Sequence, residues 1–248
     1  MGIANRVALI TGSASGIGKN IALRMAQSGA KVVINDIDAA RVEETVAGFK
    51  KEGLAVIGQV ADIINKAAVE KMVAETVEAF GGLDILVNNA GMEKAGPLRN
   101  LSESDWDITL DVNLKGAFLC AQSAHNHMIP KNHGRIINIA SRAWLGGAGQ
   151  APYSSAKAGV VGLTRVLALE LGRKGVTSNC IAPGLIHTPL WDQLPDKSKS
   201  FLLSKQPTGK LGHVDDIANA VMFLADDDSG YITGQVLYVC GGRSLFSG

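Results

Sequence analysis

Residues 11–18, Thr-Gly-Ser-Ala-Ser-Gly-Ile-Gly, decide how this chain folds. They follow a short apolar run, Val7–Thr11, and lead into an amphipathic segment, Ile17–Ser28. Glycine permits a tight turn and lets a ligand approach the backbone closely. The free N–H groups and the dipole at the start of a helix attract a pyrophosphate. We therefore interpret residues 11–18 as a phosphate-binding turn, although this spacing alone also fits a plain turn between strand and helix.

Short apolar runs alternate with longer amphipathic segments along the whole chain. The expected strands are Val7–Thr11, Lys31–Asn35, Ala55–Gln59, Asp84–Asn88, Arg135–Ala140, Thr177–Ala182 and Gln235–Val239. The expected helices include Ile17–Ser28, Ala39–Glu52, Lys66–Phe80 and Tyr153–Arg173. Because most of the runs are apolar throughout, they predict strands that are buried on both faces of a parallel sheet. The alternation predicts an α/β fold, a doubly wound sheet of about seven strands with helices on both faces.

One stretch, residues 185–211, departs from this alternation because it carries Pro189, Pro195, Pro207 and several lysines. The chain returns to a helix near Val214 and then to a strand. A mobile flap over a site explains such a stretch better than a domain boundary does. We therefore expect residues 1–248 to form one Rossmann-type catalytic domain.

The composition argues against several function classes. Lysine and arginine number 24 and aspartate and glutamate 23, so the formal net charge is +1. This balance offers no broad basic surface to nucleic acid or an anionic membrane. Cys120, Cys180 and Cys240 match no zinc-ligand spacing, and no apolar run approaches the roughly 18 residues of a membrane span. We expect a cytoplasmic protein with reduced cysteines and with no metal, nucleic-acid or membrane partner.

A carboxylate closes the second expected strand. Asp36 stands 18 residues beyond Gly18, where an acidic side chain can accept hydrogen bonds from the adenosine ribose of a dinucleotide. It would repel the additional phosphate of NADP, and Ala14, Ser15 and Ile37 supply no compensating positive charge. The alternative is a solvated aspartate at a strand end. The sequence favours NAD (NADH) over NADP.

Several motifs in one order resemble the classical short-chain dehydrogenases/reductases. They are the TGxxxGIG segment at residues 11–18, Asn88-Asn89-Ala90-Gly91, and Tyr153-Ser154-Ser155-Ala156-Lys157. Pro183-Gly184 with Thr188, and Cys240-Gly241-Gly242, continue the resemblance to the end of the chain. It implies a Rossmann-type oxidoreductase with seven parallel strands, assembled as a homotetramer or a homodimer.

The candidate catalytic residues are Asn113, Ser141, Tyr153 and Lys157. Tyr153 and Lys157 stand four residues apart on an expected helix and so share one face. A free tyrosine has a pKa of about 10, and a nearby ammonium favours the phenolate. We expect Tyr153 to exchange a proton with an alcohol or ketone while Ser141 holds its oxygen. The resemblance assigns Asn113 to a water linked to Lys157.

The residues and the resemblance together give a set of expected cofactor contacts. These are Gly12, Ser15, Gly16, Ile17, Gly18, Asp36, Asp62, Ile63, Asn89, Ala90, Gly91, Tyr153, Lys157, Ile186 and Thr188. Asp62 and Ile63 are expected beside the adenine, and Ile186 and Thr188 beside the nicotinamide. Ser141 belongs to the expected substrate site as well.

The substrate is expected to be a small secondary alcohol or its carbonyl compound. Arg142 or His187 is a hypothetical contact for an anionic group, with Trp144 or Trp191 against the apolar part; alternatively, Arg142 points to solvent or to a subunit interface. Another member of the same family, an NADPH-dependent 3-oxoacyl-thioester reductase, is the nearest alternative. A dinucleotide-binding sensor without turnover is a third.

Overall fold

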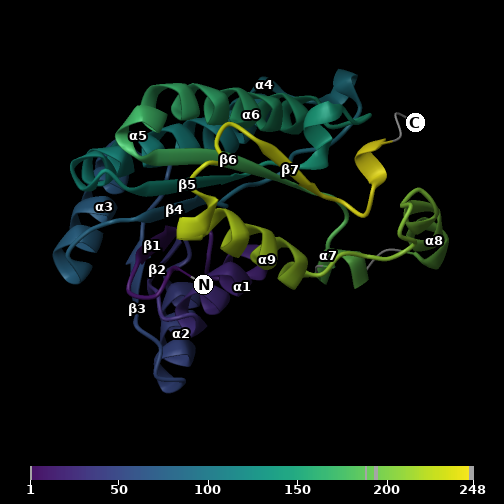
Figure 1. Cartoon of the computed structure of the whole chain (residues 1–248). Coiled ribbons are helices and arrows are strands. Elements are labelled where there is room, and N and C mark those ends of the chain that lie inside the picture. Colours follow the sequence, from purple (N-terminus) through teal and green to yellow (C-terminus); the bar gives the residue numbers. More distant parts are fainter. Residues whose placement is uncertain (1, 188, 193–194, 246–248) are drawn as a thin grey trace.

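The computed structural model describes residues 2–187, 189–192 and 195–245. Within them, seven strands form one parallel sheet in the order β3-β2-β1-β4-β5-β6-β7 (Figure 1). Their bounds are β1 (Val7–Ile10), β2 (Lys31–Asp36), β3 (Val56–Val60), β4 (Ile85–Asn88), β5 (Gly134–Ile139), β6 (Val176–Pro183) and β7 (Val236–Val239). The predicted doubly wound α/β fold is confirmed, and each expected strand is found within about one residue of its predicted ends.

Helices cover both faces of the sheet (Figure 1). One face carries α1 (Gly16–Gln27), α2 (Ala39–Lys51) and α9 (Val214–Ala225); the other carries α3 (Lys66–Phe80), α4 (Glu103–Leu110), α5 (Gly116–Met128) and α6 (Ala151–Leu171). Ile21 and Met25 of α1 pack with Val221 of α9 in a single buried cluster. Met72 of α3 and Cys120 of α5 belong to the cluster on the opposite face. The apolar strands are thus buried from both sides, as their composition predicts.

The helix starts differ in a way that bears on function. Asp38 and Asn65 cap α2 and α3, each accepting a hydrogen bond from a backbone N–H at 3.1 Å, and His213 with Asp216 caps α9. Ser15, at the start of α1, makes no such side-chain bond. The first N–H groups of α1 therefore have no side-chain acceptor at their N-cap and can serve a ligand.

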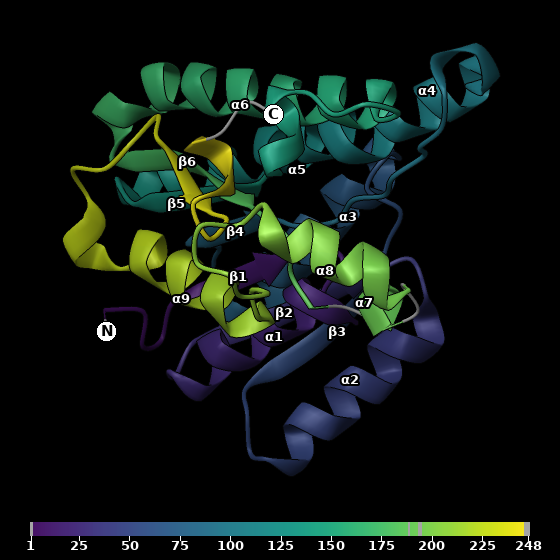
Figure 2. The ribbon, with the colours of Figure 1, turned by 90° about the vertical axis from the view of Figure 1, so that its right-hand side faces the viewer.

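The segment expected to form a flap holds two short helices, α7 (Pro189–Asp192) and α8 (Asp196–Ser204). Figure 2 shows both lying in front of the edge at which the strands end. Ligands of open α/β sheets bind at this edge. That the flap is mobile stays a prediction. None of the helices in the described segments is long and apolar enough to cross a bilayer.

Asp84, directly before β4, links the start of β4 to the start of β1. Its side chain is buried and accepts hydrogen bonds from the Val7 N–H at 2.9 Å and from Lys131 Nζ at 2.8 Å. Burial opposes ionisation, but the bonds from Lys131 and Val7 outweigh it and lower the pKa of Asp84. The side chain of Asp84 is therefore ionised in the folded protein near neutral pH.

We predict that Asp84→Asn lowers the free energy of unfolding by about 2 kcal/mol near neutral pH, because an amide cannot replace both accepted bonds. Since folding lowers the pKa of Asp84 below its unfolded value of about 3.9, this stabilisation is present above about pH 4. It is lost as the pH falls through the folded pKa. Urea unfolding across this range measures the difference between wild type and variant.

Glu70→Gln is the matched control, because Glu70 forms an exposed ion pair with Lys66 at 3.7 Å. Its loss should cost about 0.5 kcal/mol or less. The prediction is contradicted if both variants lose the same free energy of unfolding. It is also contradicted if the difference between wild type and Asp84→Asn does not become smaller in acid.

Candidate active site

The turn between β1 and α1 has the backbone that its glycines predict. Gly12 and Gly16 adopt φ of 61° and 55°, in the left-handed region that favours glycine. A Cβ at Gly18 would collide with the carbonyl oxygen of Gly12 and with the amide of Asn89. The start of α1 thus lies directly against the turn, with its backbone open to a ligand.

Thr11 and Asn89 join this turn to the end of β4. Thr11 Oγ1 accepts hydrogen bonds from the backbone N–H groups of Asn89 and Ala90, both at 3.0 Å. The Asn89 side-chain amide donates to the carbonyl oxygens of Thr11 at 2.9 Å and Gly12 at 3.0 Å. The two turns therefore form one rigid wall, and the amide of Asn89 supports the wall.

A cleft with a cavity volume of about 600 Å³ follows this wall across the strand ends. Among the expected cofactor contacts, its lining includes Gly12, Ser15, Gly16, Ile17, Gly18, Asp36, Asp62, Ile63, Asn89, Ala90 and Gly91. The uncapped start of α1 opens beside it, and Asp36 lies at the end of β2. An elongated cleft with free N–H groups at one point and a carboxylate at another fits a dinucleotide. The residues present therefore fit the expected cofactor.

A second cavity, of about 400 Å³, adjoins the first and shares Asn89 and Gly91 with it. Its lining brings together Ser141, Tyr153, Lys157 and Ile186. Three of the four candidate catalytic residues thus meet beside the expected nicotinamide position. Thr188 lies outside the described residues, and Arg142, Trp144 and Trp191 are not among the residues that line this cavity.

The structure differs from the expected ionisation of Tyr153. Burial raises the pKa of Tyr153 and the charge of Glu93 raises it further, whereas a hydrogen bond with Ser141 lowers it only in part. Lys157 Nζ lies 5.6 Å from the centre of the tyrosine ring. The expected lowering of the pKa of Tyr153 by the nearby ammonium is therefore not found in the protein by itself, because the cost of burying a phenolate is larger.

Lys157 is itself an unusual group, since its side chain is only 3% exposed. Its amine donates to the carbonyl oxygen of Ile139 at 2.9 Å, at the end of β5. Burial lowers the pKa of Lys157 to about 8. Near neutral pH the amine is still largely protonated, yet it is close to losing its proton.

Asn113 lies in a π-helical turn, η2 (Asp111–Lys115), between α4 and α5. Its Nδ2 donates to the carbonyl oxygens of Met92 at 2.7 Å and Thr109 at 2.9 Å, while its buried Oδ1 makes no hydrogen bond with the described residues. A Cβ at Gly91 would lie 2.7 Å from this oxygen and 3.4 Å from Lys157 Nζ. Asn113 Oδ1 and the lysine amine therefore face the same point; the water expected there stays a prediction.

A loop-to-loop contact beside the cleft had no signal in the sequence pattern. Gln150 Nε2 donates to Glu93 Oε1 at 2.6 Å, and the Gly96 N–H donates to the Gly149 carbonyl oxygen at 2.8 Å. These bonds join the loop after β4 to the loop before α6. Glu93 thereby becomes a negative charge near Tyr153.

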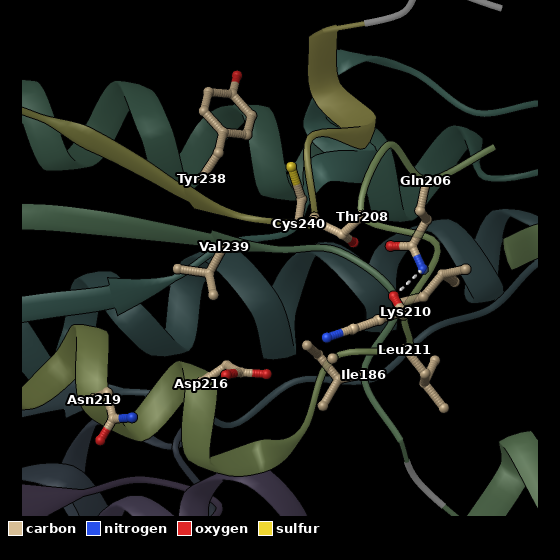
Figure 3. A pocket seen from close by; sticks show the side chains of 13 residues that line it. Ile186, Gln206, Thr208, Lys210, Leu211, Asp216, Asn219, Tyr238, Val239 and Cys240 are labelled. Carbon is tan, nitrogen blue, oxygen red and sulfur yellow. Dashed lines mark hydrogen bonds between the residues drawn. The ribbon is translucent and has the colours of Figure 1, made fainter. Parts of the chain in front are cut away.

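A third cavity, of about 440 Å³, lies between the flap and the start of α9 (Figure 3). Ile186 lines both this cavity and the cavity at Tyr153. Lys210 extends its amine into the third cavity, and Gln206 Nε2 donates to the Lys210 carbonyl oxygen at 2.8 Å. That bond lies within the flap, whereas the Thr208 N–H donates to the Gly241 carbonyl oxygen at 3.2 Å and so joins the flap to the turn after β7.

The other substrate candidates have distinct surroundings. His187 Nε2 lies 2.9 Å from Asp192 Oδ1 on the exposed flap, so an anionic ligand would have to displace that carboxylate. Trp144 stacks on Tyr238, with ring centres 6.4 Å apart. The Nε of Arg142 is buried and has no hydrogen-bond acceptor among the described residues. The described part of the chain holds no group of three or more His, Cys, Asp or Glu suited to a metal ion.

Comparisons with known proteins agree with this geometry. The family model described as enoyl-(acyl carrier protein) reductase matches residues 12–244. The chain is 72% identical over 248 residues to the (2S)-[(R)-hydroxy(phenyl)methyl]succinyl-CoA dehydrogenase subunit BbsD of Thauera aromatica, with 100% of both chains covered. It is 39% identical over 245 residues to the 3-oxoacyl-[acyl-carrier-protein] reductase FabG of Thermotoga maritima, covering 98% of this chain and 99% of that one.

Solved structures are similar over the same length. A gluconate 5-dehydrogenase from Burkholderia cenocepacia in complex with NADP and tartrate has a TM-score of 0.94 at 36% identity, covering 99% of this chain and 97% of that one. A putative gluconate dehydrogenase from Agrobacterium tumefaciens has a TM-score of 0.94 at 33% identity, with 99% and 98% covered.

We predict that Lys157→Met makes the protein more stable near neutral pH, by about 2 kcal/mol, because a buried cation is replaced by an apolar side chain. The folded pKa of about 8 lies below the unfolded value of about 10.4. Between these values the unfolded chain holds more protons, so the stability of the wild type rises with pH and the advantage of the variant shrinks. Urea unfolding from about pH 7 to about pH 10 measures this trend.

Lys71→Met is the control, since Lys71 is exposed on α3 and pairs with Glu75 at 3.7 Å. It should show no such trend with pH. A Lys157→Met protein that is less stable than the wild type near neutral pH would refute the assignment of a destabilising buried amine.

Proposed function

The chain belongs to the short-chain dehydrogenase/reductase family, and we propose that it interconverts a β-hydroxyacyl and a β-oxoacyl thioester of coenzyme A. The observation that carries this proposal is the 72% identity, from end to end, with a protein named as a subunit of (2S)-[(R)-hydroxy(phenyl)methyl]succinyl-CoA dehydrogenase. We propose that the described residues form one catalytic domain and that Tyr153, Ser141, Lys157 and Asn113 perform the chemistry.

The names of the two relatives share one chemical feature. In (2S)-[(R)-hydroxy(phenyl)methyl]succinyl-CoA the hydroxyl carbon is bonded to the carbon next to the thioester. In a 3-oxoacyl thioester the oxo group occupies the same β position. The relatives therefore favour the thioester alternative over the small secondary alcohol that the sequence alone led us to expect.

In the oxidation the hydroxyl oxygen loses a proton and the carbon that bears it loses a hydride. In the reduction both are returned to the same two atoms. When a nicotinamide dinucleotide is bound, it supplies the hydride acceptor or donor. Ser141 Oγ holds the substrate oxygen in the cavity of about 400 Å³ that it shares with Tyr153. Tyr153 Oη then donates a proton to the ketone or takes one from the alcohol. Because burial raises the pKa of Tyr153, the phenol form is ready to act as an acid in reduction.

Lys157 and Asn113 support the proton at Tyr153. The buried amine of Lys157 places a positive charge 5.6 Å from the centre of the tyrosine ring. This charge lowers the free energy of the phenolate at the moment when the proton is transferred. The free Oδ1 of Asn113 faces the same point as the amine and can accept a hydrogen bond there. We propose that this pair returns the proton from Tyr153 to solvent.

We propose NAD as the cofactor because Asp36 lines the dinucleotide cleft at the end of β2. Of the described residues that line this cleft, only Arg41 is basic, and its Nε lies 3.1 Å from Asp38. A phosphate on the ribose would meet Asp36 without a free cation beside it. The similar gluconate 5-dehydrogenase is in complex with NADP, so NAD⁺ and NADP⁺ are compared directly in the cofactor experiment.

The assembly and the location belong to the same proposal. The relative from Thauera aromatica is named as a subunit, which supports an oligomeric enzyme. Cys120, Cys180 and Cys240 are free and buried, which fits a cytoplasmic protein.

We predict that the purified protein oxidises (2S)-[(R)-hydroxy(phenyl)methyl]succinyl-CoA with NAD⁺, followed by the absorbance of NADH. Tyr153→Phe should lower kcat about 1,000-fold and leave the dissociation constant of NADH within about twofold, because only the proton transfer is lost. The matched control is Tyr231→Phe, since Tyr231 is fully exposed. The proposal fails if simple secondary alcohols are turned over more efficiently than the thioester, or if Tyr153→Phe retains full turnover.

For the cofactor, we expect kcat/KM to be about 100-fold or more higher with NAD⁺ than with NADP⁺, because two negative charges a few ångströms apart repel. Asp36→Ser should reduce this ratio at least about tenfold, mainly by improving KM for NADP⁺. Glu44→Gln, on the exposed side of α2, removes the same charge without lining the cleft and is the control. A wild type that prefers NADP⁺ would overturn the role given to Asp36.

A further inference from the structure

Arg142 directly follows Ser141 and opens a short 3-10 helix, η4 (Arg142–Leu145). Ser141 Oγ accepts a hydrogen bond from the Ala143 N–H at 3.1 Å, which fixes the start of η4 against the end of β5. The Nε of Arg142 is buried and has no acceptor among the described residues. A buried donor without a partner costs free energy, so its retention in the residue that follows Ser141 points to a ligand.

Arg243 is a second arginine without a carboxylate partner among the described residues, and it lies near the C-terminal end of the described chain. It opens η7 (Arg243–Leu245), just after the turn at Gly241 and Gly242, whose φ angles are 60° and 83°. A Cβ at Gly241 would lie 2.6 Å from Thr208 Oγ1, so the turn packs tightly on the flap. Arg243 Nη1 donates to the carbonyl oxygen of Leu202 at 3.1 Å, in α8. The guanidinium is thus held between the C-terminal turn and the flap.

One contact places the segments that carry these two arginines side by side. Trp144 of η4 stacks on Tyr238 of β7, and β7 leads directly into the turn that carries Arg243. Burial, and then the positive charge of Arg142, lower the pKa of Arg243. Neither guanidinium forms an ion pair with a carboxylate of the described residues. Two partly buried like charges without a counter-ion repel each other unless an anion lies between them.

We propose that Arg142 and Arg243 together bind a free carboxylate of the substrate, so that the protein acts on thioesters of dicarboxylic acids. This inference rests on the proposed function and adds the substrate class to it. Arginine offers a planar fork of donors that matches a carboxylate. In the substrate named for the Thauera aromatica relative, the second carboxyl group of the succinyl unit is free and lies close to the hydroxyl carbon.

The charges around the cleft give the substrate one orientation. Glu93 lines the cavity at Tyr153, and Gln150 holds its carboxylate at 2.6 Å. A substrate carboxylate avoids this negative charge and is drawn toward the two arginines. Because Arg243 also holds the flap through Leu202, the bound carboxylate contacts a residue that belongs to both the body and the cover of the site.

The experiment compares two thioesters that differ in one group. They are (2S)-[(R)-hydroxy(phenyl)methyl]succinyl-CoA and 3-hydroxy-3-phenylpropanoyl-CoA, which lacks the carboxymethyl group. We expect the wild type to have a kcat/KM about 100-fold or more higher for the first. Arg142→Met and Arg243→Met should each lower kcat/KM for it about 30-fold or more, and for the second less than about threefold.

Further variants separate charge, geometry and folding. Arg142→Lys keeps the charge without the planar fork, so it should recover only part of the loss. Arg173→Met, in a 3-10 turn after α6, removes an arginine away from the cleft and should leave kcat/KM unchanged for both thioesters. Equal losses on both thioesters in Arg142→Met and Arg243→Met would overturn the proposal.

A binding measurement keeps the test separate from turnover. Isothermal titration calorimetry with 2-benzylsuccinate and with its diamide measures recognition of the carboxylates directly. The wild type should bind the dicarboxylate at least about tenfold more tightly, and Arg142→Met and Arg243→Met should abolish that preference. If neither thioester is turned over, the proposed function fails while the calorimetry still judges the arginines. A preference for 2-benzylsuccinate that survives in both variants would overturn their role.

Discussion

The amine of Lys157 imposes the strictest constraint on this structure. A cation that is 3% exposed requires polar partners, and the protein gives it the carbonyl oxygen of Ile139 at 2.9 Å. That bond ties α6 to the end of β5. The helix in turn places Tyr153 one turn before Lys157. The burial of the amine with this one bond also explains the pKa of about 8, because one neutral acceptor does not replace the lost hydration. A buried cation of this kind destabilises the folded protein, so its presence points to a role in the reaction.

The parallel sheet lets segments far apart in sequence meet around that charge. Since all the strands point the same way, the turns after β1, β4, β5 and β6 open at one edge. Thr11 and Asn89 then join the first two turns by four hydrogen bonds of about 3.0 Å. This junction relates the dinucleotide cleft to the cavity at Tyr153 through residues that line both. The position of one cavity thus depends on the backbone that builds the other.

Local physics made the fold predictable from the sequence, and long-range physics made part of the site unpredictable. The apolar runs gave the strands, and Tyr153 with Lys157 could be paired because a helix places residues four apart on one face. The hydrogen bond of Gln150 to Glu93, and the influence of the Arg142 charge on the pKa of Arg243, arise from tertiary packing, which residue spacing does not reveal. The π-helical turn at Asn113 is one extra residue in a helix, which periodicity cannot detect. The sign of the pKa shift at Tyr153 was wrong because burial cannot be read from the spacing of Lys157.

Two of the buried polar atoms that lack a hydrogen-bond partner belong to residues at or next to the candidate active site. Asn113 Oδ1 and Arg142 Nε are both buried and unbonded among the described residues. The former faces the lysine amine at Gly91, and the latter lies beside Ser141. A buried polar atom without a partner lowers the stability of the folded protein, and a ligand that supplies the missing partner restores that free energy. Asn113 serves the fold as well, because its Nδ2 donates to the carbonyl oxygens of Met92 and Thr109; only its Oδ1 is left for a ligand or a water.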